Sequence, residues 1–404
     1  MIRQNFFPGS NVQRRPNFGM RATLSKLFTF SVLGTLLLNA LTLARNSTQL
    51  SIVHPQRPAH GIELTLGSSR SIWCQFISHT RHFLRPEMFA DRWKFIDRTD
   101  KYAVLWDDRE NLAYFWSIPW ILHMLGPEWA MQILAYESNK GFFQSIVDEF
   151  HLENVFIDTF ENRYGYGAWI SPNLMRKSQF LLAKQFWEGL DGEYILIVQD
   201  HGVPMKHWRK KEARAILETL YTYAYVGAPW SLSDTSALQT LNVSTMSPGA
   251  DFIASPGGNG GFSLRKRSWA VRHGVDMKVD TRKLLSNVTK DFQKLGVAHE
   301  DWLWGQILAR YSDGVAPKLL ASKFSVELLT DNGSLGTHNF PSYHSPRETA
   351  QFVNDAAREF FNTGELDVFE IEEKPDEQEH WLESWVSLQQ RFPNASLPME
   401  CNTP

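Results

Sequence analysis

The sequence predicts an α/β fold, in which helices flank a mostly parallel sheet and a single N-terminal transmembrane helix precedes it. Two observations predict this fold. Between residues 100 and 345, short apolar runs of strand length alternate with longer helical patterns, as in βαβ units. Near the N-terminus, an uncharged apolar run extends from Leu27 to Ala44. We therefore expect one membrane segment followed by one large folded domain.

The apolar run at 27–44 is long enough to cross a bilayer as a helix. Only basic charges precede it, which predicts a cytosolic tail at 1–26 and a lumenal remainder, the single-pass type II topology of a signal-anchor. A cleaved signal peptide ending near Thr42 and Ala44 is the first alternative. A buried core helix is the second. We expect a protein of the Golgi or ER membrane.

The chain that follows the apolar run has features of a secretory protein. Residues 45–99 are rich in His, Pro, Arg and Ser and predict a stem. Five acceptor sequons lie after the run and none before it, at Asn46, Asn242, Asn287, Asn332 and Asn394. The two cysteines, Cys74 and Cys401, exclude a disulfide-built fold but allow one bridge.

Composition limits the class of partner. The net charge of −3 argues against nucleic acid. The fifteen tryptophans suit carbohydrate stacking, although most large aromatic side chains belong to a core.

The expected domain covers residues 100–345, and a helical extension covers 346–404. We expect strands at 102–106, 131–136, 155–160, 194–198 and 324–329, and helices at 112–125, 141–150, 172–190, 264–273, 302–311, 347–361 and 381–391. Asp107, Asp108 and Asp200 each follow a predicted strand. Ligands of such sheets gather at the carboxyl ends of the strands, so these residues predict a polar site.

Four glycines surround one asparagine in the run from Gly257 to Gly261, which lets a ligand approach the backbone closely. The run precedes a predicted basic helix, a combination that suits an anion. The dinucleotide fingerprint is not met, because Ser263 stands where its third glycine would fall. The alternative is a turn that only packs tightly.

Three motifs together resemble a known family. They are Val226-Gly227-Ala228-Pro229-Trp230, the run Gly258-Asn259-Gly260-Gly261-Phe262-Ser263-Leu264-Arg265, and Glu300-Asp301. They resemble an uncharacterised, largely fungal family of glycosyltransferase-like domains of GT-A type, over roughly Lys101 to Phe340. The resemblance implies a GT-A-like, Rossmann-related sheet that binds a nucleotide-sugar donor and a glycan or glycoconjugate acceptor.

The resemblance also implies a divalent cation, Mn or Mg. The family carries a Gln-x-Asp pattern before the Val-Gly-Ala-Pro-Trp motif, whereas this chain has Gln199-Asp200-His201. Either Asp200 serves after a shift of one residue, or His201 replaces the aspartate, or metal use is lost. His338 completes the implied metal or diphosphate site, against the alternative of a structural histidine.

The resemblance assigns roles to the remaining candidates. Asp301, with Glu300, is the candidate base, against the alternative that acidic residues simply favour a helix N-terminus. A direct base implies inversion at the anomeric carbon. Asp107 and Arg109 are expected near the nucleotide, or else in a surface salt-bridged turn. Trp230 stacks on a sugar or a base, or packs in the core. Gly258, Asn259, Gly260 and Gly261 are expected to shape the donor or acceptor pocket.

Three functions remain open at this point. The first is a membrane-anchored glycosyltransferase with a nucleotide-sugar donor. The second is a catalytically inactive carbohydrate-binding or complex-assembly subunit, which the displaced Asp200 favours. The third, a metal-dependent hydrolase, lacks a dense His/Asp cluster.

Overall fold

The computed structural model describes residues 68–90, 99–164, 180–230, 256–274, 300–329, 333–361 and 385–398. The predicted tail at 1–26, the predicted membrane segment at 27–44 and the first part of the predicted stem lie outside the described residues. Among the helices that are described, none is both long and apolar enough to cross a bilayer.

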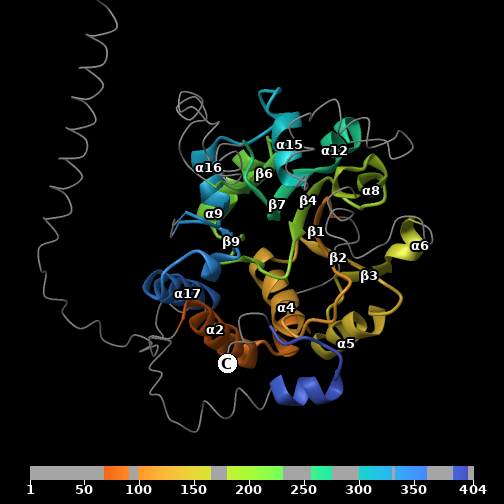
Figure 1. Ribbon diagram of the computed structural model, residues 1–404, viewed down its shortest axis with the longest axis vertical. Helices are drawn as coiled ribbons and strands as arrows, with labels where there is room; N and C mark the ends of the chain where they lie inside the picture. Colours follow the sequence, from red (N-terminus) through yellow and green to blue (C-terminus); the bar gives the residue numbers. More distant parts are fainter. Residues whose placement is uncertain are drawn as a thin grey trace, which may run out of the picture. The chain divides into compact units, whose positions relative to one another are not determined.

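A six-stranded sheet organises the domain (Figure 1). Its strands, in spatial order, are β3 (Val155–Thr159), β2 (Ala130–Ala135), β1 (Lys101–Trp106), β4 (Tyr194–Val198), β7 (Asn259–Lys266) and β6 (Tyr225–Ala228). The first four are parallel, and β7 runs antiparallel to both of its neighbours. The predicted α/β fold with a mostly parallel sheet is therefore confirmed.

The strand order reverses direction between β1 and β4. From β1 the chain builds outward to β2 and β3, and it then returns to place β4 on the other side of β1. The first connection runs through α4 (Tyr114–Leu125), the second through α5 (Lys140–Phe150) and the third through α6 (Phe160–Tyr164) and α8 (Lys184–Glu188). Such a reversal leaves an opening at the carboxyl ends of the two central strands, which is where ligands bind in sheets of this kind.

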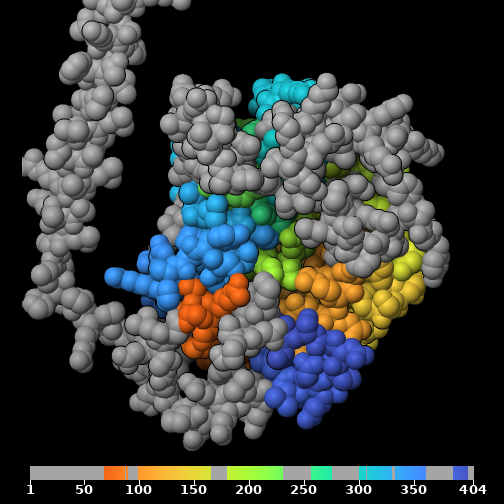
Figure 2. Space-filling view, in the orientation of Figure 1, coloured from red at the N-terminus to blue at the C-terminus, as the bar shows by residue number. Residues whose placement is uncertain are grey.

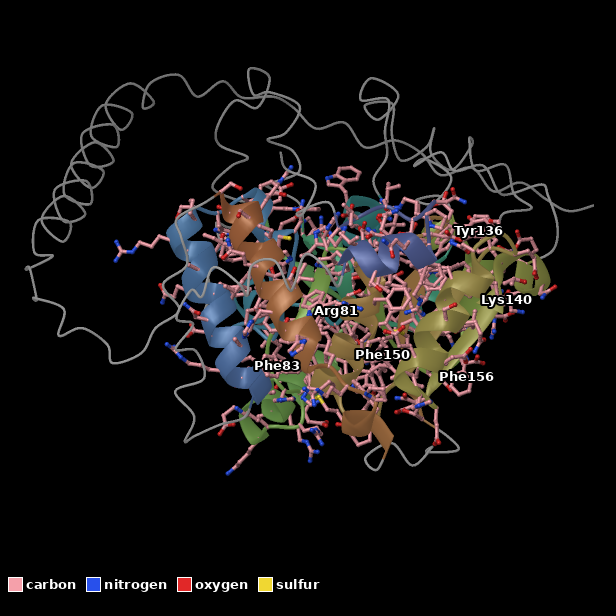
Figure 3. The ribbon with its side chains drawn as sticks, turned by 90° about the horizontal axis from the view of Figure 1, so that it is seen from below. Arg81, Phe83, Tyr136, Lys140, Phe150 and Phe156 are labelled. Carbon is pink, nitrogen blue, oxygen red and sulfur yellow. The ribbon has the colours of Figure 1, made fainter. Side chains whose placement is uncertain are left out.

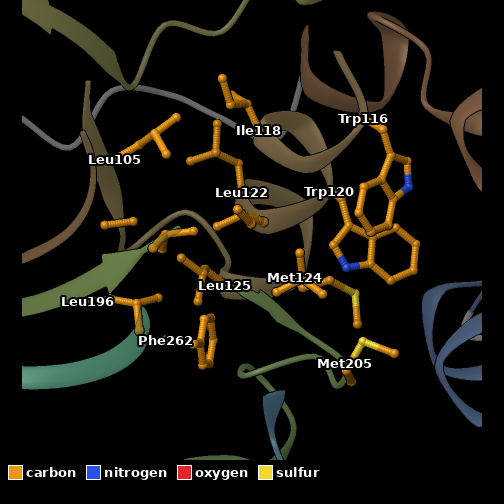
Figure 4. Packing of buried hydrophobic residues seen from close by; sticks show 14 of the residues in the cluster. Leu105, Trp116, Ile118, Trp120, Leu122, Met124, Leu125, Leu196, Met205 and Phe262 are labelled. Atoms are coloured by element: carbon orange, nitrogen blue, oxygen red, sulfur yellow. The ribbon is translucent and has the colours of Figure 1, made fainter. Parts of the chain in front are cut away.

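Helices cover both faces of the sheet (Figure 1). Because strand side chains alternate between faces, Leu105 packs with α4 and α5, whereas Val104 packs with α8 and with α15 (Glu300–Leu308). The first face is filled by the uniformly buried helix α4, whose Leu125 lies beside Leu196 and Phe262 of the sheet (Figure 4).

The remaining helices complete these layers. They are α2 (Ser69–Phe83), α3 (Glu87–Ala90), α9 (Lys211–Leu220), α12 (Arg267–His273), α16 (Lys318–Phe324), the 3-10 turn η2 (Phe340–Ser342) and α17 (Pro346–Phe361). Residues 385–391 are also helical, and the segment 385–398 lies against the surface of the α4 and α5 region (Figure 2).

A smaller sheet continues from the end of β4. It contains β5 (Gly202–Pro204), β9 (Gly336–His338) and β8 (Ser325–Val326), with β9 in the middle. Gly202 pairs with His338, and the amide of Asn339 donates to the carbonyl of His201 at 2.9 Å. This pairing brings His338 close to the carboxyl end of β4, although the two segments are far apart in sequence.

The second half of the predicted stem is part of the folded domain. Helix α2 starts at the N-cap Ser68 and buries Ile72, Trp73 and Phe76 in the main core. It lies beside α17 (Figure 3). A stem that reaches to residue 99 is therefore wrong for residues 68–90. The apolar spacing of Ile72, Phe76 and Ile77 was the available signal, and it was outweighed by the polar composition around it.

The glycine run adopts a different structure from the one expected. Asn259, Gly260 and Gly261 begin strand β7, and this strand continues through Lys266, so the helix starts only at Arg267. The predicted helix at 264–273 is wrong for its first three residues, because Leu264 and Arg265 pair with β4 and β6. A glycine loop that opens a helix, and the anion site that it implied, are not present. The predicted strand at 324–329 is likewise shorter, since Phe324 ends α16.

Candidate active site

An ion network joins the carboxyl ends of β1 and β4. Asp107 follows β1 and is 3% exposed. Its two carboxylate oxygens accept from Nε and Nη2 of Arg109, at 2.9 and 2.7 Å. Nη2 also donates to Oδ2 of Asp200, which follows β4, at 2.8 Å. The reversal point between the two strands therefore carries one guanidinium held by two carboxylates.

Neighbouring side chains fix Asp107 in position. The hydroxyl of Tyr114 donates to Asp107, and Asn139 donates through Nδ2 to the Asp107 carbonyl at 3.1 Å. Burial and the nearby carboxylate raise the pKa of Tyr114, and the bonds to Asp107 raise the pKa of Arg109. Arg109 therefore remains a cation, and its orientation is set by a buried anion below it.

Arg109 is nevertheless open to solvent. Its side chain is 54% exposed, whereas Asp107 and Asp200 are mostly covered. The nitrogen Nη1 takes part in none of the three bonds described above. A planar guanidinium with a free edge is well suited to bind phosphate oxygens. Two alternatives were expected for Asp107 and Arg109: a salt-bridged turn, or a position near a nucleotide. The salt-bridged turn is present, and its exposed guanidinium is compatible with the second alternative as well.

Asp200 and His201 interact with each other at the same edge. His201 Nε2 lies 3.4 Å from Oδ1 of Asp200, and Arg109 occupies Oδ2. Both carboxylate oxygens of Asp200 therefore have partners. Across the described ranges, no group of three or more His, Cys, Asp or Glu side chains is placed to hold a metal ion.

The two glycines that begin β7 face opposite sides of the sheet, as successive strand residues do. A Cβ on Gly260 would lie 2.6 Å from both Arg265 Nη2 and Glu300 Oε1. A Cβ on Gly261 would instead lie 2.1 Å from His338 Nε2 and 2.7 Å from Gln199 Oε1. The run is glycine-rich because polar side chains approach its backbone from both faces.

On the Gly260 face, the acidic pair at the start of α15 is enclosed. Glu300 forms a buried ion pair with Arg265 at 2.8 Å. Asp301 accepts from the amide of Gly260 at 3.1 Å and from the amide of Trp302 at 2.7 Å, one on each oxygen. Burial, and then the charge of Glu300, raise the pKa of Asp301 to about 8. Through these contacts, the carboxylate of Asp301 joins the start of α15 to the start of β7.

On the Gly261 face lies a second pair, which the sequence alone did not reveal. His338 Nδ1 is 3.1 Å from Oε1 of Glu327, and Nδ2 of Asn259 donates to the same oxygen at 3.1 Å. All three side chains lie within or beside the strands β7, β8 and β9. Glu327 directly follows β8, but it falls inside the predicted strand at 324–329, so its place at a strand end could not be recognised from the sequence.

Gly258 and Trp230 lie further along the same strand pair. Gly258 has φ +84°, and a Cβ there would be 2.1 Å from the carbonyl oxygen of Ala228, so only glycine fits. Its own carbonyl accepts from the hydroxyl of Tyr225 at 2.9 Å. Trp230 is 9% exposed, which favours its packing role.

Two of the predicted site residues, Asp301 and His338, lie against β7 but on opposite faces of the strand. Asp301 bonds to Gly260 on one face. His338 packs on Gly261 on the other, and Gln199, next to Asp200, donates its amide to the Gly261 carbonyl at 2.8 Å. Asp301, the candidate base, and His338, one of the candidate metal ligands, are therefore separated by the strand.

A family model described as a protein of unknown function (DUF5672) matches residues 168–341. This match agrees with the resemblance to a domain of unknown function. No curated protein matches the chain in sequence.

Three solved glycosyltransferases are similar in structure. They are mouse xyloside xylosyltransferase 1 in its apo form (10% identity, 61% of this chain, 99% of that chain, TM-score 0.39), the galactosyltransferase LgtC with donor and acceptor sugar analogues (11%, 62%, 95%, 0.36), and the mannosyltransferase PcManGT from Pyrobaculum calidifontis with GDP-mannose and Mn²⁺ (11%, 80%, 92%, 0.31).

Proposed function

We propose that the protein is a glycosyltransferase that moves a sugar from a nucleotide-sugar donor to a glycan or glycoconjugate acceptor. The observation that carries the proposal is the exposed Arg109 guanidinium at the reversal point between β1 and β4. Ligands of α/β sheets bind at this point, and a diphosphate is an anion that a guanidinium binds with paired hydrogen bonds.

Sugar transfer requires that charge on the departing diphosphate be stabilised. Arg109 offers its free Nη1 for this purpose, and Asp107 keeps the guanidinium oriented beneath the solvent. Because the group is already in place, little reorganisation accompanies the development of negative charge. Asp107 and Arg109 are accordingly proposed on the donor side.

A divalent cation, Mn or Mg, belongs to the same proposal. His338 fits it, because its Nε2 is buried beside Gly261 and has no hydrogen-bond partner within the described part of the chain. Asp200 and His201 fit less directly, since both oxygens of Asp200 are engaged. When bound, the cation would neutralise diphosphate charge, and His338 and Asp200 would hold it. Asn259, Gly260 and Gly261 shape the backbone between the two sides.

Glu300 and Asp301 take a supporting role in this proposal. Their contacts hold the β7 backbone at Gly260 and leave no carboxylate oxygen of Asp301 without a donor. A loss of activity in Asp301→Asn is still expected, because the amide has one acceptor oxygen for the backbone N–H groups of Gly260 and Trp302, so one of these two bonds is lost.

A secretory setting, the Golgi or ER membrane with the domain in the lumen, is part of the proposal. Two observations support it. Cys74 is disulfide-bonded, and such bonds persist in oxidising compartments. Asn394 of the last sequon is exposed.

The test is turnover by the purified full chain with a panel of nucleoside-diphosphate sugars and Mn²⁺, measured as nucleotide release. We expect release with at least one donor. Replacing Arg109 with methionine should lower kcat/KM by about 100-fold or more, the usual effect of removing one charge-stabilising donor. Arg358→Met is the matched control, because Arg358 is an exposed arginine of α17 that pairs only with Asp355 among the described residues. Absence of both turnover and nucleotide binding for every donor would overturn the proposal.

The inactive carbohydrate-binding or assembly subunit is the second candidate. The bonds that occupy both oxygens of Asp200 favour it. Calorimetry separates the two: nucleotide binding that depends on Mn²⁺ supports the enzyme, whereas oligosaccharide binding that is indifferent to nucleotide and metal supports the subunit.

A further inference from the structure

Glu327 is a buried carboxylate whose contacts link three strands. Val326 pairs with Thr337 in the parallel β8 and β9 strands, so the residues that follow, Glu327 and His338, emerge side by side. Glu327 is 3% exposed and His338 is 7% exposed. Burying a carboxylate is costly unless it is hydrogen-bonded. Oε1 of Glu327 contacts His338 Nδ1 and Asn259 Nδ2 at 3.1 Å each, whereas Oε2 is buried with no hydrogen-bond partner among the described residues.

These contacts favour one tautomer of His338. Oε1 of Glu327 already accepts from the side-chain amide of Asn259, so the arrangement that completes a hydrogen bond at this contact has Nδ1 of His338 as the donor. In a neutral imidazole, Nε2 then carries the lone pair. Asn259 is fixed in the matching orientation, because its Oδ1 accepts from the amide of Gly261 at 2.7 Å while its Nδ2 donates to Glu327.

Nε2 of His338 lies against the backbone of Gly261, where the missing Cβ leaves room for the imidazole. It is buried, and it has no hydrogen-bond partner among the residues that the structure describes. It lies 2.1 Å from the position that a Cβ on Gly261 would take. The exposed side chain of Gln199 borders the same position, with Oε1 at 2.7 Å from it. The nitrogen therefore lies one side chain below the surface, next to the end of β4.

We propose that Glu327 is a positioning residue, which holds His338 with Nδ1 protonated so that Nε2 presents its lone pair to a divalent cation. A carboxylate behind a metal-binding imidazole orients the ring and strengthens the nitrogen as a ligand. This inference rests on the proposed function for the presence of a cation, and it adds a residue that neither the motifs nor the predicted ligands included. Gly261 is explained by the same geometry, since any side chain there would displace the imidazole.

The first test is the tautomer, which needs no metal and no substrate. The full chain is labelled with ¹⁵N-histidine, and the His338 signals are identified by their loss in His338→Ala. We expect a protonated Nδ1 and an unprotonated Nε2. Glu327→Ala should shift His338 toward the other tautomer, whereas Glu327→Gln, which keeps an acceptor oxygen, should preserve the native one. A protonated Nε2 in the wild-type protein would overturn the proposal.

The second test is the dissociation constant for Mn²⁺ alone, followed by electron paramagnetic resonance of the free ion. Loss of a residue behind a metal ligand typically weakens binding about 10–100-fold, which we expect for Glu327→Ala, with a smaller loss for Glu327→Gln. His338→Ala should weaken binding at least as much. Glu149→Ala is the matched control, because Glu149 takes part only in ion pairs with Arg391 and Arg81 among the described residues.

The outcomes separate this inference from the proposed function. Wild-type affinity in a folded Glu327→Ala protein, or no Mn²⁺ binding by the wild-type protein, overturns the inference. Sugar transfer in the absence of Mn²⁺ would leave the proposed function standing. Glu327→Ala is interpreted only if it unfolds in a single cooperative transition. If it does not, the dissociation constant for Mn²⁺ is compared between Glu327→Gln and the wild-type protein, and equal values overturn the inference.

Discussion

At the scale of single residues, the candidate site is held by buried charges that satisfy one another. Arg265 is 2% exposed, bonds to Glu300 and lies over the rings of Tyr225 and Trp187, with its guanidinium carbon 5.0 and 5.6 Å from the ring centroids. Removing water from two charges is costly, so each of them depends on its partner. The beginning of β7 is therefore sensitive to any change in these charges.

The first residue-scale prediction concerns this ion pair. Glu300→Gln should lower the free energy of unfolding by about 3–5 kcal/mol, because it leaves the Arg265 charge buried without its counter-ion. Asp355→Asn, which breaks the exposed pair with Arg358, should cost less than about 1 kcal/mol. Urea denaturation measures both changes. An equal decrease in the free energy of unfolding in the two variants would show that the buried ion pair contributes no more to stability than the exposed pair.

The second residue-scale prediction concerns pH. The pKa of Asp301 is raised to about 8, above its unfolded value, so the folded state binds this proton more tightly. Its contribution to stability is full below about pH 4 and is lost as the pH rises through 8, with a slope of at most about 1.4 kcal/mol per pH unit. Asp301→Asn cannot titrate, and its amide has one acceptor oxygen for the two backbone donors. Asp301→Asn should be less stable than the wild-type protein at low pH. The difference between their free energies of unfolding should become smaller as the pH rises toward 8.

Urea denaturation at several pH values tests this prediction. Asp313→Asn, at an exposed turn, serves as the control and should keep a constant difference from the wild-type protein. A constant difference for Asp301→Asn as well would contradict the raised pKa.

At the scale of elements, the position of the site depends on how α2 and α17 support α4. Trp120 of α4 stacks on Phe360 of α17 with ring centroids 4.6 Å apart, and Phe76 of α2 contacts Trp120 edge-on at 5.3 Å. Thr80 of α2 accepts from the indole of Trp116 at 2.9 Å. Helix α4 in turn carries Tyr114, which holds Asp107. Helix α2 therefore supports the candidate site indirectly, because it packs on the aromatic side chains of α4, and α4 carries the tyrosine that holds Asp107.

The element-scale prediction follows from this packing. A chain that begins at His60 should unfold in one transition near that of the full protein. A chain that begins at Thr99 lacks α2 and uncovers the sides of Trp116 and Trp120 that Phe76 and Thr80 contact. Each large apolar side chain that loses its cover costs about 1.5–3 kcal/mol, so the summed loss approaches the total stability of a domain, about 5–15 kcal/mol. Circular dichroism during heating measures the outcome. If the chain that begins at Thr99 is folded and active, residues 68–90 are not required by the domain, and the predicted stem at 45–99 would stand.

At the scale of the whole domain, two sheets meet at the proposed site. The six-stranded sheet supplies the ends of β1 and β4, and the smaller sheet supplies Glu327 and His338 through β8 and β9. The link is the pairing of Gly202 with His338. A rearrangement between the sheets would therefore change the distance between Arg109 and His338 without altering either group.

The prediction at this scale concerns compartment. If the domain is lumenal, Asn394 should carry a glycan, because its side chain is exposed and Ser396 completes the sequon beside Glu110. Expression in a secretory eukaryotic cell should give a protein whose gel mobility increases with endoglycosidase. Asn394→Gln should remove part of that shift. A mobility that no endoglycosidase changes would contradict lumenal exposure.

The sequence by itself determined the alternation of elements and hence the parallel sheet. Local periodicity is a property of neighbouring residues, so strands such as 102–106 and helices such as 141–150 could be predicted within a few residues. Asp107 and Asp200 could also be placed, because Asp107 directly follows β1 and Asp200 comes two residues after the end of β4. The same reasoning failed at Leu264 and Arg265, since their basic neighbours suggested a helix while cross-strand pairing with β4 and β6 placed them in the sheet.

Only the tertiary structure decided on which face each candidate lies and which groups pair. No local pattern could show that Arg109 bridges two carboxylates 91 and 2 residues away, because that contact depends on the order of β1 and β4 in the sheet. The same is true of Glu327, which acquires a role only when β8 pairs with β9. The sequence specifies the chemical type of each side chain, whereas the order of the strands determines which distant side chains come into contact. A functional site requires both.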